Sequence, residues 1–119
     1  MPDRVDADDA DRMVARGGSY GGLMTCWIGT QTDRFKALVN HAGVYNLLSQ
    51  FASDFIYGRP RLYGANPWED VGPVEKWSSA RYMNNAKTPT LVLHGEKDYR
   101  VPYTQALECY NILRAKGVE

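Results

Sequence analysis

A serine stands between two pairs of glycines in the segment Gly17-Gly18-Ser19-Tyr20-Gly21-Gly22. An apolar run at 13–15 precedes it and a longer run with helical spacing follows, so the sequence predicts strand, tight turn and helix with Ser19 at the apex. A hydroxyl exposed there is suited to attack a carbonyl carbon if a neighbouring base takes its proton. Such a turn is strained, and Gly17 and Gly21 would remove side chains that clash in it. The alternative is a glycine-rich turn that contains a serine by chance.

The helix expected after Ser19, over residues 20–31, would supply the second part of that chemistry. Its first turn points backbone N–H groups, beginning with that of Tyr20, at the place where an oxyanion would form. Gly22 would let the helix pack close to a sheet. An apolar stripe suited to covering the sheet is predicted from Leu23, Met24, Trp27 and Ile28.

A second candidate group, Asp98, lies in a turn after the apolar segment 90–94. An aspartate there can orient an imidazole and stabilise the imidazolium formed when the ring takes the serine proton. The alternative is a turn aspartate that caps its own loop. Both histidines, His41 and His94, precede Asp98. We expect His94 to support the loop and His41 to pack or hydrogen-bond beneath the site, so neither is the expected base.

The order of elements predicts an α/β fold around a mostly parallel sheet. Strands are expected over 12–16, 35–40 and 90–94, and a second long helix over about 103–116. The apolar centre of the middle strand predicts a sheet buried on both faces. The second helix predicts an apolar stripe of Ala106, Leu107, Tyr110 and Leu113, with Gly117 as its C-cap. Ser19 and Asp98 would both follow carboxyl ends of strands, where catalytic groups gather in such sheets.

Two stretches differ from these elements. Residues 1–11 are rich in aspartate and are expected to form a solvated, acidic lead-in. Residues 48–87 form an aromatic-rich insertion that glycines and prolines interrupt, which predicts short helices joined by ordered loops. The whole chain, residues 1–119, is expected to be one partial domain.

The composition narrows the function classes. Fourteen basic residues balance fourteen acidic ones, so nothing favours nucleic acid or an anionic membrane as a partner. No apolar run approaches the ~20 residues needed to cross a bilayer, and the N-terminus has no signal-peptide pattern. Cys26 and Cys109 are expected to be small buried residues, not a disulfide framework or a metal site, and no cofactor is indicated. An intracellular, cytoplasmic location is the default expectation.

Three stretches together resemble the catalytic domain of the prolyl oligopeptidase family of serine peptidases, most of all its dipeptidyl-peptidase and acylaminoacyl-peptidase branch. They are 17–22, with the tyrosine after the serine, 35–47, and 87–102, which includes His94-Gly95-Glu96-Lys97-Asp98. The likeness covers about residues 10–119. Ser79 replaces a proline usual in the family, and Arg16 stands in a strand that is normally apolar.

The resemblance implies a partial, three-layer α/β-hydrolase fold and peptides as substrates. It makes Ser19 the nucleophile, Asp98 the triad acid and the Tyr20 N–H one oxyanion donor. The family's catalytic histidine would follow the next strand, beyond Glu119, and its second oxyanion donor and β-propeller would precede residue 10. We therefore expect a fragment with little or no triad turnover of its own. The alternatives are a carboxyl-ester hydrolase of the same fold, and a non-catalytic fragment that self-associates through an exposed sheet edge.

Overall fold

The computed structural model describes residue 9 and residues 11–54 and 64–119, and its centre is a three-stranded parallel sheet. The strands are β1 (Val14–Gly18), β2 (Ala37–His41) and β3 (Thr90–Leu93), in the order β1-β2-β3. Because both pairings are parallel, the carboxyl ends of all three strands lie at one edge. The parallel sheet and the α/β class are confirmed, although β1 begins and ends two residues later than predicted.

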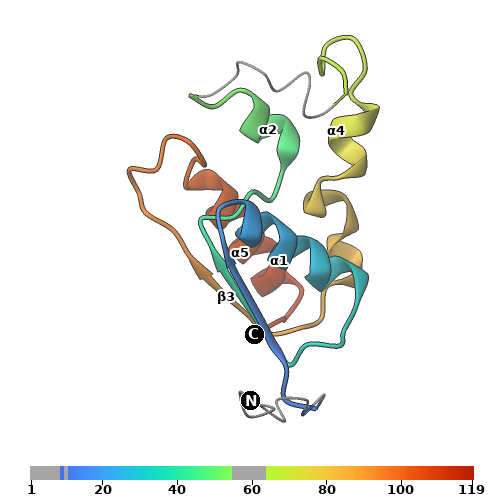
Figure 1. Ribbon diagram of the computed structural model, residues 1–119, viewed down its shortest axis with the longest axis vertical. Helices are drawn as coiled ribbons and strands as arrows, with labels where there is room; N and C mark the ends of the chain where they lie inside the picture. Colours follow the sequence, from blue (N-terminus) through green and yellow to red (C-terminus); the bar gives the residue numbers. More distant parts are fainter. Residues whose placement is uncertain (1–8, 10, 55–63) are drawn as a thin grey trace, which may run out of the picture.

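Two long helices, α1 (Tyr20–Gln31) and α5 (Thr104–Ala115), lie on the same side of this sheet (Figure 1). They meet through two buried free thiols, with 3.8 Å between Cys26 Sγ and Cys109 Sγ. The expectation that these cysteines are buried is therefore confirmed. None of the helices within the described residues is long and apolar enough to cross a membrane.

Within its described residues, the insertion contains three short helices, α2 (Leu47–Phe51), α4 (Gly72–Lys76) and η1 (Ser79–Asn85). In Figure 1, α2 and α4 lie beyond the carboxyl ends of the strands. Residues 55–63 of the insertion, and most of the acidic lead-in, lie outside the described residues. The insertion therefore stands at the same end of the sheet as the predicted site.

The apolar stripe predicted for α1 is wrong. The buried residues of this helix are small ones, Gly22, Thr25, Cys26, Gly29 and Thr30. Small residues are needed because the helix lies very close to β2: a Cβ added to Gly29 would stand 2.7 Å from Leu38 Cδ1. Large side chains do not fit on that face of the helix.

The larger side chains of α1 instead meet the insertion. Trp27 packs against Trp77 and Tyr82, with ring centroids 5.4 Å and 5.3 Å away. Leu23 packs against a buried cluster of Val44, Leu47, Val74 and Val101. The stripe predicted to cover the sheet thus holds the short helices of the insertion in place.

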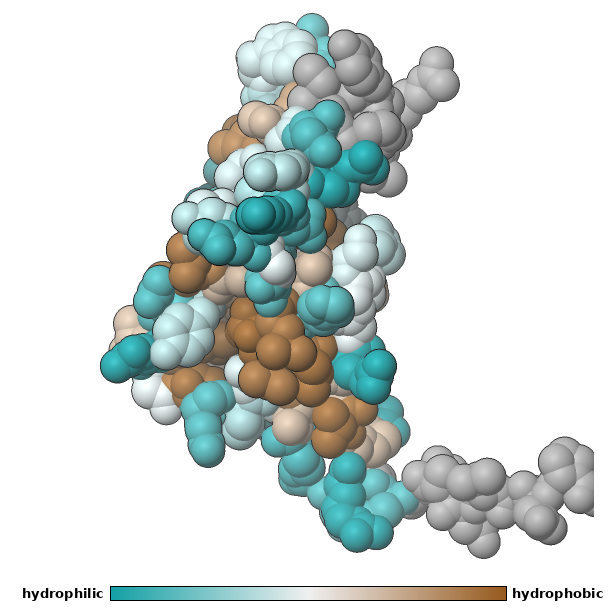
Figure 2. Space-filling model, turned by 90° about the vertical axis from the view of Figure 1, so that its left-hand side faces the viewer, coloured by the Kyte–Doolittle hydropathy of each residue, from teal (hydrophilic) through white to brown (hydrophobic). Residues whose placement is uncertain are grey.

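The opposite face of the sheet is uncovered by the described residues, so the prediction of burial on both faces is wrong for them. Val14, Leu91 and Leu93 point to this face and are 55%, 55% and 46% exposed. Arg16 lies on this face as well and is exposed, so its charge is not buried in the core. Figure 2 shows a broad apolar area on this side of the molecule. Of the three layers expected, the described residues form two.

The stripe predicted for α5 is half right. Ala106 and Leu113 are buried, but Leu107 and Tyr110 are nearly half-exposed. Their places in the interior are taken by Cys109 and by a polar residue, Gln105. At the end of the helix Gly117 has a φ of 75°, and the Val118 amide donates to the Leu113 carbonyl at 2.9 Å, which is the capping geometry that glycine permits.

Candidate active site

The turn between β1 and α1 presents Ser19 at the carboxyl edge of the sheet. Its φ of 56° and ψ of −115° lie in a region that costs a non-glycine residue about 1–3 kcal/mol. The Ser19 N–H donates to the His41 carbonyl at 2.9 Å, which ties the turn to the end of β2. The residue is exposed, and its hydroxyl makes no hydrogen bond with the described part of the chain. The serine is therefore held by its backbone while its side chain stays accessible.

The glycines around Ser19 have different steric roles. A Cβ on Gly17 would stand 2.2 Å from the Gly21 carbonyl oxygen, and one on Gly22 would stand 2.5 Å from Gly43 Cα. These close approaches agree with the reasons for which glycine is expected at 17 and 22. Gly21 differs, because a Cβ there would meet nothing within 4 Å. Its own backbone, rather than its missing side chain, fills the space that Gly17 leaves.

The first turn of α1 leaves backbone donors beside Ser19. The first α-helical hydrogen bond runs from the Leu23 N–H to the Ser19 carbonyl, at 3.0 Å. The amide of Tyr20, the first helical residue, therefore precedes any intrahelical acceptor. The Tyr20 side chain is 67% exposed and does not cover the turn. An anionic oxygen next to Ser19 would meet the positive end of this helix.

The loop after β3 folds around the carboxylate of Asp98. Oδ1 accepts from the backbone N–H groups of Arg100, at 3.1 Å, and Val101, at 2.9 Å. Asp98 thus caps its own loop, which was the alternative considered for it. Its second oxygen, Oδ2, accepts no hydrogen bond from the described residues and lies 3.7 Å from His94 Nε2. One oxygen shapes the loop and the other stays open to a further donor.

The two histidines lie on opposite sides of this arrangement. The side chain of His94 is 5% exposed, and its Nε2–H donates to the Val101 carbonyl at 2.6 Å, so it supports the loop as expected. His41 departs from the expectation that its side chain packs or hydrogen-bonds beneath the site. Its ring is exposed, because it is the last residue of β2 and points to the uncovered face beside Gly18. Its backbone carbonyl accepts the Ser19 N–H, and its ring lies beside Gly18.

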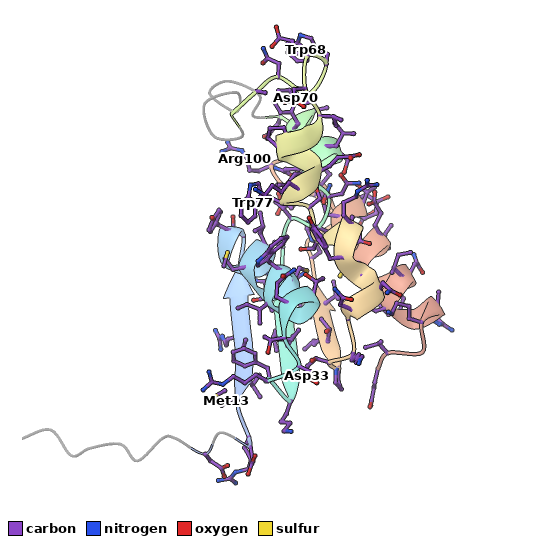
Figure 3. The ribbon with its side chains drawn as sticks, turned by 90° about the vertical axis from the view of Figure 1, so that its right-hand side faces the viewer. Met13, Asp33, Trp68, Asp70, Trp77 and Arg100 are labelled. Carbon is purple, nitrogen blue, oxygen red and sulfur yellow. The ribbon has the colours of Figure 1, made fainter. Side chains whose placement is uncertain are left out.

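Ser19 and Asp98 follow strands at opposite sides of β2 and are joined by no hydrogen bond. Figure 3 shows the polarity of the sheet: Met13 and Asp33 lie at the lower end, while Arg100 of the Asp98 loop lies towards the upper end. Both predicted residues therefore share one end of the sheet with a gap between them. A third group would have to take the Ser19 proton while Asp98 orients it.

Sequence reasoning missed the residues that support the Asp98 loop from outside. Gln50, in α2, donates to the Arg100 carbonyl at 2.7 Å, and Gln105, in α5, accepts from the Tyr45 and Asn46 amides. The sequence gives only a weak indication that Gln105 is buried, because a glutamine near the start of a helix is usually exposed. Nothing in the pattern around 50 marks it.

A pair of buried thiols lies behind the turn. Asn40 Nδ2 donates to Cys26 Sγ at 2.8 Å. The hydrogen bond between Cys26 and Cys109, together with burial, raises the pKa of the Cys26 thiol well above its usual range. Within residues 9, 11–54 and 64–119, no group of three or more metal-ligating side chains is found.

Comparison with known proteins agrees with this geometry. The family model described as "Prolyl oligopeptidase family" matches residues 6–119. Dipeptidyl-peptidase 5 of Schizosaccharomyces pombe is 40% identical over 113 residues, which cover 92% of this chain and 16% of that protein. The uncomplexed acylaminoacyl peptidase of Pyrococcus horikoshii superposes with a TM-score of 0.88 at 38% identity, over 93% of this chain and 18% of that one.

A further acylaminoacyl peptidase structure, in complex with Z-Gly-Gly-Phe-chloromethyl ketone, gives a TM-score of 0.87 at 38% identity, over 93% of this chain and 18% of that one. The chain thus spans about a sixth of the length of these relatives. The sheet, the serine turn and the matched segment together identify the chain as a member of the prolyl oligopeptidase family of serine peptidases.

Proposed function

We propose that this chain carries the nucleophile and the acid of a serine peptidase that cleaves peptide bonds by acyl transfer. The observation that carries the proposal is the backbone of Ser19, which is held at a φ of 56° at the carboxyl end of β1 with its hydroxyl exposed at the head of α1. A strained serine in such a turn is typical of an activated nucleophile. The membership in a peptidase family supports peptides as the substrate class.

In this proposal Ser19 Oγ attacks the peptide carbonyl carbon while an imidazole takes its proton. The carbonyl oxygen becomes an oxyanion, and the Tyr20 N–H donates to it. The tetrahedral intermediate expels the amine, which takes the proton from the imidazole, and leaves an ester on Ser19. Water, deprotonated by the same imidazole, then releases the acid and restores the hydroxyl. Gly17, Gly21 and Gly22 give the turn its shape.

Asp98 would orient that imidazole through Oδ2. Its Oδ1 already accepts two backbone amides, so the carboxylate has one fixed and one available oxygen. A carboxylate held in this way gives an imidazole N–H an acceptor of defined direction and stabilises the imidazolium. The open Oδ2 supports the assignment of Asp98 as the triad acid.

We propose that the imidazole comes from outside this chain. His94 is enclosed by its own loop, with Nε2 bonded to the Val101 carbonyl. His41 is exposed on the uncovered face, where its ring lies beside Gly18. Without its base a serine loses most of its reactivity, so the chain alone would turn over little or no substrate.

A fluorophosphonate probe tests both parts of the proposal. The longest polypeptide that the gene encodes with this chain inside it should be labelled and should hydrolyse peptide anilides. Ser19→Ala should abolish both the labelling and the hydrolysis. Tyr20→Phe is the matched control, because it keeps the backbone N–H and should be labelled normally. Labelling that survives in Ser19→Ala would overturn the nucleophile, and strong Ser19-dependent labelling of the 119-residue chain would overturn an external base.

Two rival functions make different predictions. A carboxyl-ester hydrolase would cleave a p-nitrophenyl ester and leave an aminoacyl amide intact, whereas the proposed peptidase cleaves the amide. A peptidase relative that binds a peptide chloromethyl ketone supports the amide. For the 119-residue chain alone, we also propose self-association through the uncovered sheet face and the edge of β1, since Leu91 and Leu93 are about half-exposed there.

A further inference from the structure

Two glutamines are buried where the insertion meets the Asp98 loop. Gln105 has no exposed surface, and Gln50 is 5% exposed. A primary amide is costly to bury unless hydrogen bonds replace those it made with water. Gln50 Oε1 has no partner among the described residues, so the bonds of Gln50 Nε2 and of both ends of the Gln105 amide show what each side chain holds.

Gln105 holds the segment that leaves β2. Its Oε1 accepts from the backbone N–H of Tyr45, at 2.9 Å, and of Asn46, at 2.8 Å. Its Nε2 donates to Ser49 Oγ at 2.6 Å. Asn46 is in turn the N-cap of α2, and its Oδ1 accepts from the backbone N–H groups of Leu48 and Ser49. The start of α2 is thus fastened to the first turn of α5.

Gln50 makes the reverse connection. Its Nε2 donates to the Arg100 carbonyl at 2.7 Å, and the Ser53 hydroxyl donates to the same oxygen at 3.0 Å. A further bond joins the same two segments: Arg100 Nε donates to Asp54 Oδ1 at 3.1 Å. The peptide N–H of this same Arg100 is one of the two donors to Asp98 Oδ1. Gln50 is therefore separated from the Asp98 carboxylate by a single residue.

We infer that Gln50 and Gln105, which we call the glutamine clamp, are positioning residues for Asp98. Gln105 fixes α2 on α5, and Gln50 carries that fixed position to Arg100 and so to the carboxylate. The internal bonds of the loop define its shape, and its place relative to α2 is set by contacts with neighbouring segments: the packing of Val101 and the bond from Gln50. This inference rests on the proposed role of Asp98 as triad acid.

Hydrogen exchange measured residue by residue by NMR tests the clamp in the 119-residue chain. Gln50→Met keeps the length and bulk of the side chain and removes the donor. We expect exchange of the Arg100 and Val101 amides to rise about tenfold, as loss of one buried hydrogen bond implies. The Leu38 amide, which donates to the Pro89 carbonyl in the sheet, should change less than about twofold. Gln105→Met should raise exchange at Tyr45 and Asn46 first.

The matched control is Gln31→Met, at an exposed glutamine at the end of α1, which should leave all of these amides unchanged. Unchanged exchange at Arg100 and Val101 in Gln50→Met would overturn the inference. A uniform rise over the whole chain, including Leu38, would also overturn it, since that is the pattern of general destabilisation and not of a positioning role.

The longest encoded polypeptide gives a second test through its pH profile. We expect Gln50→Met to lower kcat about tenfold with little change in KM, because a displaced acid weakens only the transition state. The acid limb of the profile should move to lower pH, since a displaced carboxylate stabilises the imidazolium less. An unchanged kcat and acid limb would overturn the clamp. Failure of the proposed function is separate: it would show as missing Ser19-dependent labelling in the unsubstituted protein.

Discussion

The serine turn and the Asp98 loop lie at the same edge of one sheet, yet they are held by opposite means. Around Ser19 the chain is fixed by backbone packed on backbone, as where Gly22 lies against Gly43. Around Asp98 it is fixed by side chains: one carboxylate, one imidazole and two buried amides supply the bonds. The turn requires glycines, which have no side chain, and the loop requires hydrogen-bond donors and acceptors.

This difference separates the ways in which the two regions can fail. Backbone packing tolerates almost no added volume, because the interior is close-packed and the main chain cannot rotate away. A hydrogen-bonded loop tolerates a change of shape better than the loss of a partner, since the cost lies in unpaired buried groups. The two regions should therefore respond differently to added atoms and to removed bonds.

The largest effect should come from adding one methyl group behind the serine turn. Gly22→Ala places a Cβ within 2.9 Å of three atoms, two of them in the Gly43 backbone, so we expect a loss of about 3 kcal/mol or more of unfolding free energy. Urea denaturation followed by circular dichroism measures it. Gly21→Ala is the control: no atom lies within 4 Å of its Cβ, and the change should stay within about 1 kcal/mol. Equal losses in both variants would show that steric fit does not hold the turn.

The next effect should come from removing an acceptor in the Asp98 loop. Asp98→Ala leaves the Arg100 and Val101 amides without their acceptor and should cost about 2 kcal/mol in a urea titration. Asp98→Asn keeps an oxygen at Oδ1 and should cost less than about 1 kcal/mol. In the active polypeptide both variants should lose most of their turnover. If the asparagine variant were as unstable as the alanine variant, the negative charge and not the acceptor would be holding the loop.

A smaller effect on stability, dependent on pH, should arise at Tyr45, which contacts residues behind both regions. Its amide is bonded to Gln105, while its ring packs in the cluster that contains Cys26 of α1. Burial, helped by Cys109 and Glu108, raises the pKa of Tyr45 to about 12. The folded state therefore keeps a proton that the unfolded state loses above its ordinary pKa of about 10. Stability should be full below about pH 10 and should fall by about 1–2 kcal/mol as the pH rises towards 12.

The measurement for Tyr45 is urea denaturation at a series of alkaline pH values. Tyr45→Phe removes the ionisable hydroxyl, which makes no hydrogen bond with the described residues, so it should cost little at neutral pH. The variant should also lose less stability on the way to pH 12 than the unsubstituted chain. The same slope in both proteins would assign the alkaline loss to other groups.

The smallest change in stability should accompany substitutions outside both regions, on the uncovered sheet face. The pair Leu91→Thr and Leu93→Thr should alter the unfolding free energy by less than about 1 kcal/mol, because both side chains are already half-exposed. It should nevertheless reduce concentration-dependent sedimentation of the 119-residue chain. Leu107→Thr, at a leucine of similar exposure on α5, is the control and should leave sedimentation unchanged. Identical behaviour of all these proteins would remove the sheet face as the self-association surface.

Sequence reasoning works well at the serine turn because its requirements are local. A strand, a strained serine and the start of α1 fall within about ten residues, and the helix bounds 20–31 agree with the structure. The other long elements agree within two residues at each end, since glycines, prolines and apolar periodicity mark those ends. Asp98 could be singled out for the same reason, as the acidic residue in the turn that follows a short apolar strand.

What could not be predicted depends on contacts between distant segments. Gln50 and Arg100 are far apart along the chain, and only the folded insertion brings them together. The same holds for α1: its hydrophobic pattern points to Leu23 and Trp27, yet the closeness of β2 selects small residues for the sheet and leaves those side chains for the insertion. Periodicity reports that a helix has an apolar face, not which neighbour that face meets.

The contact of Trp27 with Trp77 and Tyr82 has a practical consequence for watching this protein fold. Aromatic rings at these separations couple electronically, and the coupling gives a near-ultraviolet circular dichroism signal that vanishes when the rings part. Trp68, 74% exposed, packs against Phe51 and not against this group. The chain therefore contains its own optical reporter for one event, the docking of residues 72–85 on the helix behind the serine turn. Undocking of the insertion would be followed by the loss of this signal.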